Sequence, residues 1–216
     1  MDQKEEMSRQ TEFVHLRVHS EYSVIDGLIR VKSLTAKAAA LNMPAVAITD
    51  HVNLYALIKF YKAANGAGVK PICGCDILIS DEENPEKYCL LVLLVKNLKG
   101  YKNLTDLISR AHLEGQYRGN PCIKRSWLEG KTDGLIALSG GRTGDIGRAI
   151  LNADPALAGE LLQGWMDVFP DSFYLELHRT SRPGEEEYIH GAVSLAEKFS
   201  CPVVATNDVR FLEEDE

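Results

Sequence analysis

Short apolar runs alternate with longer segments of helical periodicity, and this alternation limits the possible folds more than any other feature of the sequence. Seven runs have the length and β-branched content of strands: 13–18, 45–49, 71–79, 88–95, 134–138, 173–177 and 202–206. Between them the pattern predicts helices at 31–41, 54–67, 101–114, 145–151, 155–169 and 184–199. Such alternation is typical of β/α units with parallel strands. These units either close into a barrel or form an open doubly wound sheet, and periodicity alone does not decide which.

Breaker residues stand where such units need them. Residues 42–44 (Asn-Met-Pro) and 67–69 (Ala-Gly-Val) end two of the predicted helices just before a strand. The acidic stretch 80–87 (SDEENPEK) contains a proline and is predicted to be a surface hairpin turn. It would join two adjacent antiparallel strands.

Length and composition favour a single folded domain. The chain has 216 residues, of which 45% are hydrophobic, enough to bury one sizeable core. We expect 1–12 to be a disordered polar segment, 13–212 to form the domain and 213–216 to begin a connection to further domains. No export signal or membrane-length apolar run is present, so we expect a cytoplasmic protein with no membrane partner. Five cysteines, an odd number, indicate reduced thiols rather than a disulfide framework.

The net charge of −7 argues against tight binding of DNA by this segment alone, because non-specific affinity comes from clustered Lys and Arg. Two groups of basic residues could still line a local patch. They are Lys59, Lys62 and Lys70, and Arg118, Lys124 and Arg125. Acidic residues are interspersed with both groups, so a solvated surface is the simpler interpretation.

Side chains that can bind metal ions stand at or just after several predicted strands. They are His19, Asp26, His51, Asp76 and Asp208. The carboxyl ends of strands meet in either β/α architecture, and imidazole and carboxylate groups are the ligands of multinuclear hydrolytic sites. A single histidine at a strand end is more often a structural residue than a ligand, and an aspartate there is often a helix cap. The metal-site hypothesis therefore depends on the whole set.

Six segments of the sequence, in this order and spacing, resemble the N-terminal PHP (polymerase and histidinol phosphatase) domain of bacterial DNA polymerase III alpha subunits. They read FVHLRVHSEYSVIDG, PAVAITDHVNL, FYKAANGAGVKPICGCD, GYKNLTDLISRA, GLIALSGG and VVATNDVRF. The resemblance covers nearly the whole chain, and six ordered blocks are far more specific than one motif. It implies an α/β fold, an irregular seven-stranded β/α barrel of the PHP type.

The resemblance also implies a degenerate metal site. Intact members hold three metal ions through nine side chains. Residues acceptable to the active pattern stand at four of the nine positions, and two more could still ligate. These six are His19, Asp26, His51 and Asp208, then Asp76 in place of a glutamate and Cys89 in place of a histidine. Three positions are lost, at Arg17, Gly141 and Arg210.

Losing ligands leaves a group of close carboxylates that repel one another. Arg17 and Arg210 stand at two of the lost positions, where their guanidinium groups could pair with Asp26, Asp76 and Asp208. The hypothesis is that the two arginines take over the charge-neutralising role of the metal ions. The alternative is that both arginines project into solvent.

Two functions follow from the resemblance. The first is a catalytically inactive domain that stabilises a DNA-directed DNA polymerase and docks its proofreading exonuclease subunit, with the polymerase aspartates and their Mg²⁺ beyond residue 216. Its partners would be the remaining polymerase domains, the exonuclease subunit and, through the full holoenzyme, DNA. The second is an active metal-dependent phosphoesterase, either a proofreading nuclease or a histidinol-phosphatase-like enzyme. We expect no cofactor in this chain, or at most one residual Zn²⁺ or Mn²⁺.

Overall fold

The computed structural model describes residues 13–81 and 86–213. In these ranges the strands are β1 (Ala45–Ile48), β2 (Lys70–Ser80), β3 (Tyr88–Val95), β4 (Gln116–Tyr117), β5 (Asn120–Lys124), β6 (Leu135–Leu138), β7 (Phe173–Leu177) and β8 (Val203–Ala205). The helices are α1 (Val31–Ala40), α2 (Leu57–Gly66), α3 (Leu98–Glu114), α4 (Asp145–Leu151), α5 (Pro155–Val168) and α6 (Glu185–Phe199). Two 3₁₀ turns, η1 (Arg125–Leu128) and η2 (Gly141–Thr143), complete the elements.

The long strand β2 organises the sheet. Its first residues pair in parallel with β1, its remainder pairs antiparallel with β3, and its last residues pair in parallel with β5. From β3 the sheet continues through β6 and β7 to β8. Register pairs Ser80 with Tyr88, and the Asp81 amide donates to the Lys87 carbonyl, which confirms the predicted antiparallel neighbours. Residues 82–85 of the predicted turn lie outside the described ranges.

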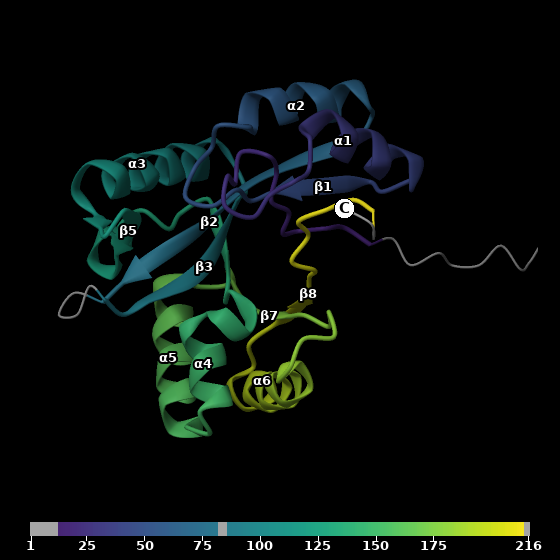
Figure 1. Cartoon of the computed structure of the whole chain (residues 1–216). Coiled ribbons are helices and arrows are strands. Elements are labelled where there is room, and N and C mark those ends of the chain that lie inside the picture. Colours follow the sequence, from purple (N-terminus) through teal and green to yellow (C-terminus); the bar gives the residue numbers. More distant parts are fainter. Residues whose placement is uncertain (1–12, 82–85, 214–216) are drawn as a thin grey trace, which may run out of the picture.

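The sheet closes into a barrel through the segment 15–19, which lies between β1 and the residues that follow β8. The Ala47 amide donates to the His15 carbonyl at 2.8 Å, and the His19 amide donates to the Val209 carbonyl at 2.9 Å. Figure 1 shows this purple segment beside the yellow end of the chain. The segment 15–19 and the strands β1, β2, β3, β6, β7 and β8 together form the wall of the predicted irregular seven-stranded barrel.

Two details of the predicted strands are wrong. The run 13–18 forms no regular strand, only a bridge from Val18 to Val209, because its backbone groups are divided between two different neighbours. The hairpin of β4 and β5 was not predicted at all. It turns at Arg118 and Gly119, both with positive φ, and such a short pair carries little hydrophobic pattern.

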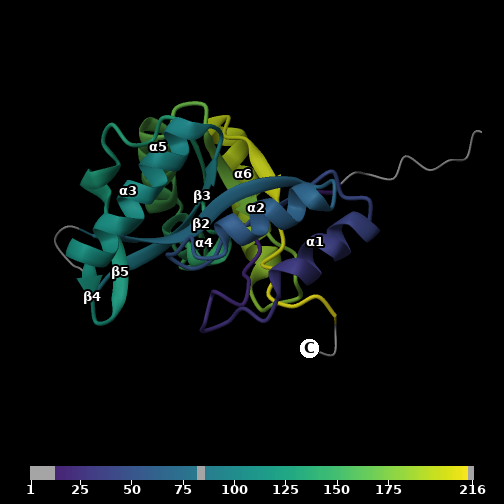
Figure 2. The ribbon, with the colours of Figure 1, turned by 90° about the horizontal axis from the view of Figure 1, so that it is seen from above.

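Helices cover the outside of the barrel, α1 to α3 on one side and α4 to α6 on the other (Figures 1 and 2). The main core lies between the sheet and its helices, where Trp165 of α5 stacks on Phe173 of β7 with ring centroids 6.3 Å apart. A smaller cluster that contains Ala47, Val92 and Leu138 fills the interior. All five cysteines are free, as predicted. No helix in the described part of the chain is long and apolar enough to cross a membrane.

Candidate functional site: a buried cluster of charged side chains

The candidate site lies at one end of the barrel interior. Val18 packs among the apolar residues of α1 and α2, and because side chains alternate along an extended segment, Arg17 and His19 point the opposite way, into the barrel. Both are almost fully buried, with 3% and 1% of their surface exposed. They meet the carboxylates of β2, β7 and the residues after β8.

Arg17 is the centre of the cluster. Its Nε donates to Asp76 Oδ2 at 2.9 Å, and a terminal nitrogen lies 2.8 Å from the same oxygen. The same guanidinium is 3.9 Å from Glu176 Oε2 and 3.8 Å from Asp208 Oδ1. One cation is therefore shared by three carboxylates that come from distant parts of the chain.

His19 joins two carboxylates. Its Nε2 lies 2.9 Å from Asp76 Oδ2, and its Nδ1 lies 3.0 Å from Asp26 Oδ1. Asp26 is carried by the loop between the segment 15–19 and α1, and about a third of its side chain is exposed. Both ring nitrogens of His19 are thus occupied by protein oxygens.

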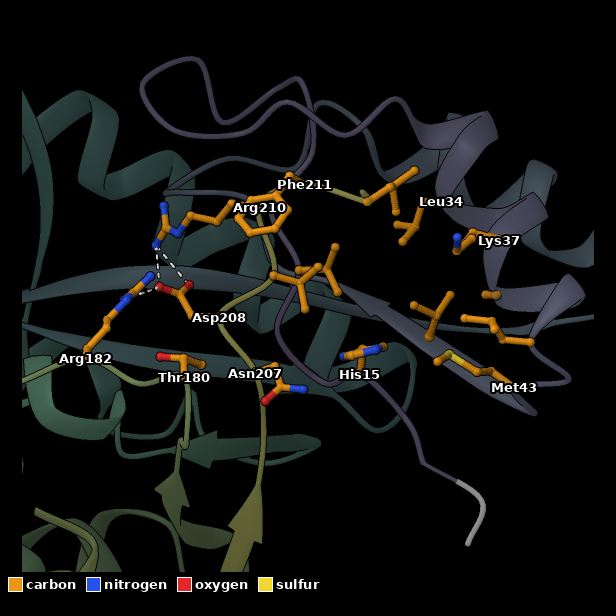
Figure 3. Close-up of a pocket in the computed structure, with 16 residues that line it drawn as sticks. His15, Leu34, Lys37, Met43, Thr180, Arg182, Asn207, Asp208, Arg210 and Phe211 are labelled. Atoms are coloured by element: carbon orange, nitrogen blue, oxygen red, sulfur yellow. Dashed lines mark hydrogen bonds and ion pairs between the residues drawn. The ribbon is translucent and has the colours of Figure 1, made fainter. Parts of the chain in front are cut away.

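Arg210 provides a second cation beside the first. Its guanidinium lies 2.9 Å from Asp208 Oδ1 and also contacts Asp26. From the other side Arg182 lies 3.1 Å from Asp208 Oδ2 (Figure 3). Arg182, Asp208 and Arg210 form one end of a cavity of about 550 Å³ whose other walls are mostly apolar. The arginine pairs that the sequence analysis predicted are therefore present, with Arg182 in addition.

Charge pairing holds the buried carboxylates ionised. Burial by itself would raise the pKa of Asp76, but Arg17 and His19 lower that pKa to about 2. Burial opposes ionisation of Glu176 too, and the charge of Arg17 nevertheless lowers its pKa. Arg17 benefits in return: burial would lower its pKa, yet the charge of Asp76 raises it above the ordinary value. Burial and Arg17 lower the pKa of Arg210 to about 10, so it stays charged at neutral pH.

Glu176 and His178, at the end of β7, belong to the cluster and were missed. Glu176 is fully buried and accepts a hydrogen bond from Thr206 Oγ1 at 2.6 Å, and His178 Nε2 lies 2.9 Å from its Oε1. Glu176 lies near the end of the predicted strand 173–177 and His178 directly follows it, so their place at its carboxyl end was the available signal. His178 also occupies the space beside Gly141, where an added Cβ would lie 2.8 Å from the imidazole.

The predicted site residue His51 and its neighbour Asp50 have different surroundings. Asp50 is a structural residue, because its carboxylate accepts hydrogen bonds from the Ser20 amide at 2.7 Å and from the Ser23 hydroxyl at 2.8 Å. His51 follows it and forms a parallel bridge with Asp76. Burial lowers the pKa of His51, and Asp76 and Arg17 are near enough to influence it, so His51 borders the charged cluster.

Cys89 does not join the cluster. In the register of β2 and β3, Asp76 is opposite Val92 and Cys89 is opposite Ile79. Side chains alternate along a strand, so Cys89 points to the helices while Asp76 points into the barrel. Its charged neighbours are instead Asp145, Arg125 and Arg148, and burial raises its pKa to about 12. The assignment of Cys89 as a metal ligand is therefore corrected.

The cluster does not fit a trinuclear metal centre. A divalent ion between Asp76 and Asp208 would have to displace the Arg17 guanidinium, and both nitrogens of His19 already face carboxylates. Among the residues that the structure describes, no three His, Cys, Asp or Glu side chains are arranged to hold an ion. Asp76 Oδ1 and Glu176 Oε2 are the buried carboxylate oxygens left without a hydrogen bond in that part of the chain. The arrangement is an ion-pair network.

The fold and this cluster define a barrel of the PHP class. The family model described as "PHP domain" matches residues 15–180, and the chain belongs to this family. More particularly, the chain is 52% identical over 204 residues to DNA polymerase III subunit alpha of Pseudomonas aeruginosa, and 52% identical over 201 residues to that of Escherichia coli. The two alignments cover 94% and 93% of this chain, but the chain spans only about a sixth (17%) of each relative.

Solved structures support the same fold. An amidohydrolase from Chromobacterium violaceum with bound sulfate and no metal aligns with a TM-score of 0.60 at 15% identity, covering 94% of this chain and 89% of that one. A putative metal-dependent phosphoesterase from Bifidobacterium adolescentis aligns with a TM-score of 0.52 at 13% identity, covering 92% and 87%. At these identities the likeness concerns the fold alone.

Proposed function

We propose that this chain is the PHP domain of a replicative DNA polymerase III alpha subunit, and that it serves there as a structural and docking domain without phosphoesterase activity. The assignment to the alpha subunit rests on the two relatives named above. The loss of hydrolytic activity rests on one observation, the Arg17 guanidinium among Asp76, Glu176 and Asp208.

Hydrolysis by a site of this class needs metal ions that lower the pKa of a bound water and stabilise the leaving oxygen. Guanidinium groups can neutralise carboxylates, but they have no lone pair with which to bind or activate a water in that way. In this cluster Arg17 and Arg210 hold the carboxylates in place of ions, and His19 keeps Asp26 and Asp76 together. What remains is a buried charged cluster that stabilises the barrel where the segment 15–19 meets the residues after β8.

The full-length protein would carry out DNA-directed DNA synthesis with Mg²⁺ bound to other domains. The partners of this domain would be the remaining alpha-subunit domains and the proofreading exonuclease subunit. Contact with DNA would come mainly through the complete holoenzyme, because this segment has a net charge of −7. The protein would work in the cytoplasm.

The test combines metal analysis with an activity assay on the purified 216-residue chain. We expect no stoichiometric zinc or manganese by elemental analysis, and no hydrolysis of nitrophenyl phosphate, nucleotides or single-stranded DNA. Turnover that is abolished both by chelator and by His19→Ala would refute the proposal and revive the phosphoesterase alternative. Stoichiometric metal that survives dialysis would contradict it as well.

A further inference from the structure

The cavity beside the charged cluster continues as a groove between α1 and the residues that follow β8. Its volume is about 550 Å³; one wall comes from α1 and the turn after it, and the other comes from residues 207–212. Figure 3 shows Leu34 and Met43 across this groove from Asp208. We call it the α1 groove. Its apolar lining consists of Val18, Leu34, Ala38, Leu41, Met43, Val46, Val209, Phe211 and Leu212.

The charged side chains at the ends of the α1 groove already have partners within the domain. Asp208 is paired with Arg182 and Arg210. Lys37 Nζ lies 2.7 Å from Glu213 Oε1. Because these charges are paired, the surface of the α1 groove that still lacks a partner is its apolar wall, and a complementary occupant is apolar.

Part of this apolar wall is open to water. Val18 and Val46 are completely buried at the bottom of the groove, whereas Leu41 is 50% exposed and Phe211 is 53% exposed. The groove also continues the apolar cluster of α1, α2 and β1, against which Met43 and Val209 pack. Large apolar side chains that stay exposed around a hollow, next to an existing core, indicate an interaction site.

The α1 groove lies where the β/α pattern of the barrel would place a helix. The helices that follow β1, β3, β6 and β7 cover the outside of the sheet, and they are α2, α3, α4 with α5, and α6 (Figure 1). In the described part of the chain, the residues after β8 form no helix. These residues run along the groove beside α1, so a helix that followed β8 in the same pattern would pack there.

We propose that the α1 groove receives the apolar face of the first helix that forms in the alpha-subunit polypeptide after residue 216. The proposal deepens the docking role proposed above and rests on it. The relatives provide the polypeptide, because this chain spans only 17% of each of them. Residues 209–212 already line the groove, so a connection of ordinary length, roughly two to six residues, would bring the helix back onto it. The helix would carry apolar residues at a spacing of three and four positions.

The test measures the accessibility of introduced cysteines in the full-length alpha subunit. Leu41→Cys and Phe211→Cys place thiols on the two walls of the α1 groove. Ile58→Cys, at a position of α2 that is 64% exposed and does not line the groove, is the matched control. Each protein is treated with iodoacetamide, and mass spectrometry measures the labelled fraction of the peptide that contains the introduced cysteine. Native cysteines therefore do not contribute to the readout.

We expect both groove variants to be labelled roughly tenfold more slowly than Ile58→Cys, because an occupied groove must open before the reagent reaches the thiol. A benzophenone attached through a maleimide to the Leu41→Cys protein, during prolonged incubation, then identifies the occupant by photo-crosslinking. The crosslinked peptide should come from the first helix after residue 216. A mixture of ¹⁴N-labelled and ¹⁵N-labelled protein shows whether that peptide belongs to the same molecule, as expected, or to a second copy.

Equal labelling at positions 41, 58 and 211 would show that the groove is open and would overturn the proposal. A crosslink to residues 1–12, to a second copy or to a later domain of the alpha subunit would overturn it too, as would the absence of any crosslink. Primer extension by the full-length wild type reports separately on the proposed function. Activity together with an open groove would refute the groove assignment alone, whereas a protein that extends no primer would contradict the proposed function itself.

Discussion

Arg17 is the side chain that neutralises the most carboxylates among the described residues, because three of them lie within 4 Å of its guanidinium group. A divalent metal ion would neutralise these carboxylates with two positive charges and would hold them in a fixed coordination shell. A guanidinium does it with one charge and directed N–H groups, so the surrounding carboxylates must be held in place by other donors. Thr206 holds Glu176 in place with a hydrogen bond, and Arg182 and Arg210 hold Asp208 in place with ion pairs.

Replacing Arg17 by Ala should destabilise the domain by about 3–5 kcal/mol, because it leaves Asp76 and Glu176 buried without their main cationic partner. Urea unfolding followed by circular dichroism measures this. Arg210→Ala should cost only about 1 kcal/mol, since 23% of that side chain is exposed and water can replace it. Equal losses for the two variants would mean that Arg17 is not the central cation.

Acid should weaken the domain through Asp76. Its pKa is about 2 in the folded chain against an ordinary 3.8, so ionised Asp76 contributes stability above about pH 4. That contribution, about 2 kcal/mol, is lost as pH falls toward 2. Urea midpoints measured between about pH 5 and pH 2 should show this fall. This decrease of the urea midpoint should be smaller in Asp76→Asn. It should persist in the control variant Asp106→Asn, which removes an exposed aspartate. If Asp76→Asn showed the same pH dependence as the wild type, Asp76 would not be the group responsible.

At the scale of elements, the connection between β2 and β3 is the one expected to tolerate change. β2 pairs with β3 continuously from Gly74 to Ser80, and the Asp81 amide donates to the Lys87 carbonyl at the end of the hairpin. Deleting residues 82–84 should therefore barely change the melting temperature, because the ladder fixes the register without them. A loss of many degrees in calorimetry would show that the deleted residues pack against the rest of the domain.

Elements with long apolar or amphipathic patterns could be predicted from the sequence. All six helices and the strands from β1 onward, except β4 and β5, lie within a few residues of their predicted ranges. The site was predictable where a polar residue breaks an apolar strand end, as at His19 and Asp208. Cys89 was placed wrongly because sequence spacing does not show on which face of β3 a residue points. His178 directly follows the predicted strand 173–177 and could have been proposed on that ground, but its contact with Gly141, 37 positions away, is tertiary and leaves no local pattern.

At the scale of the whole domain, rebuilding a metal site tests whether the cluster occupies the place of a former centre. Arg17→His, Gly141→Cys and Arg210→His restore the residue types of the active pattern. The structure adds His178→Ala, because a Cβ at position 141 would collide with the His178 ring, and φ of +58° there already strains any side chain. Without metal this variant should melt below the wild type, since the carboxylates have lost their cations.

Adding zinc or manganese should raise the melting temperature of the rebuilt variant, because binding to the folded state stabilises it. The wild type is the matched control, and its melting temperature should not respond. If chelator and metal give the same melting curve for the rebuilt variant, these positions do not surround a former metal site.

The closure of the barrel also has a consequence for how the chain folds during synthesis. Val18 pairs with Val209, so the segment 15–19 cannot complete its pairing until the residues around Val209 leave the ribosome, about 190 residues later. At ordinary bacterial elongation rates this is a delay on the order of ten to forty seconds. During this delay Arg17 and His19 lack the contacts of the complete cluster, because Asp208 has not yet been synthesised. The synthesis of β8 and the residues that follow it therefore completes the ion-pair network and the barrel together. A nascent chain that stalls before these residues should be sensitive to proteolysis.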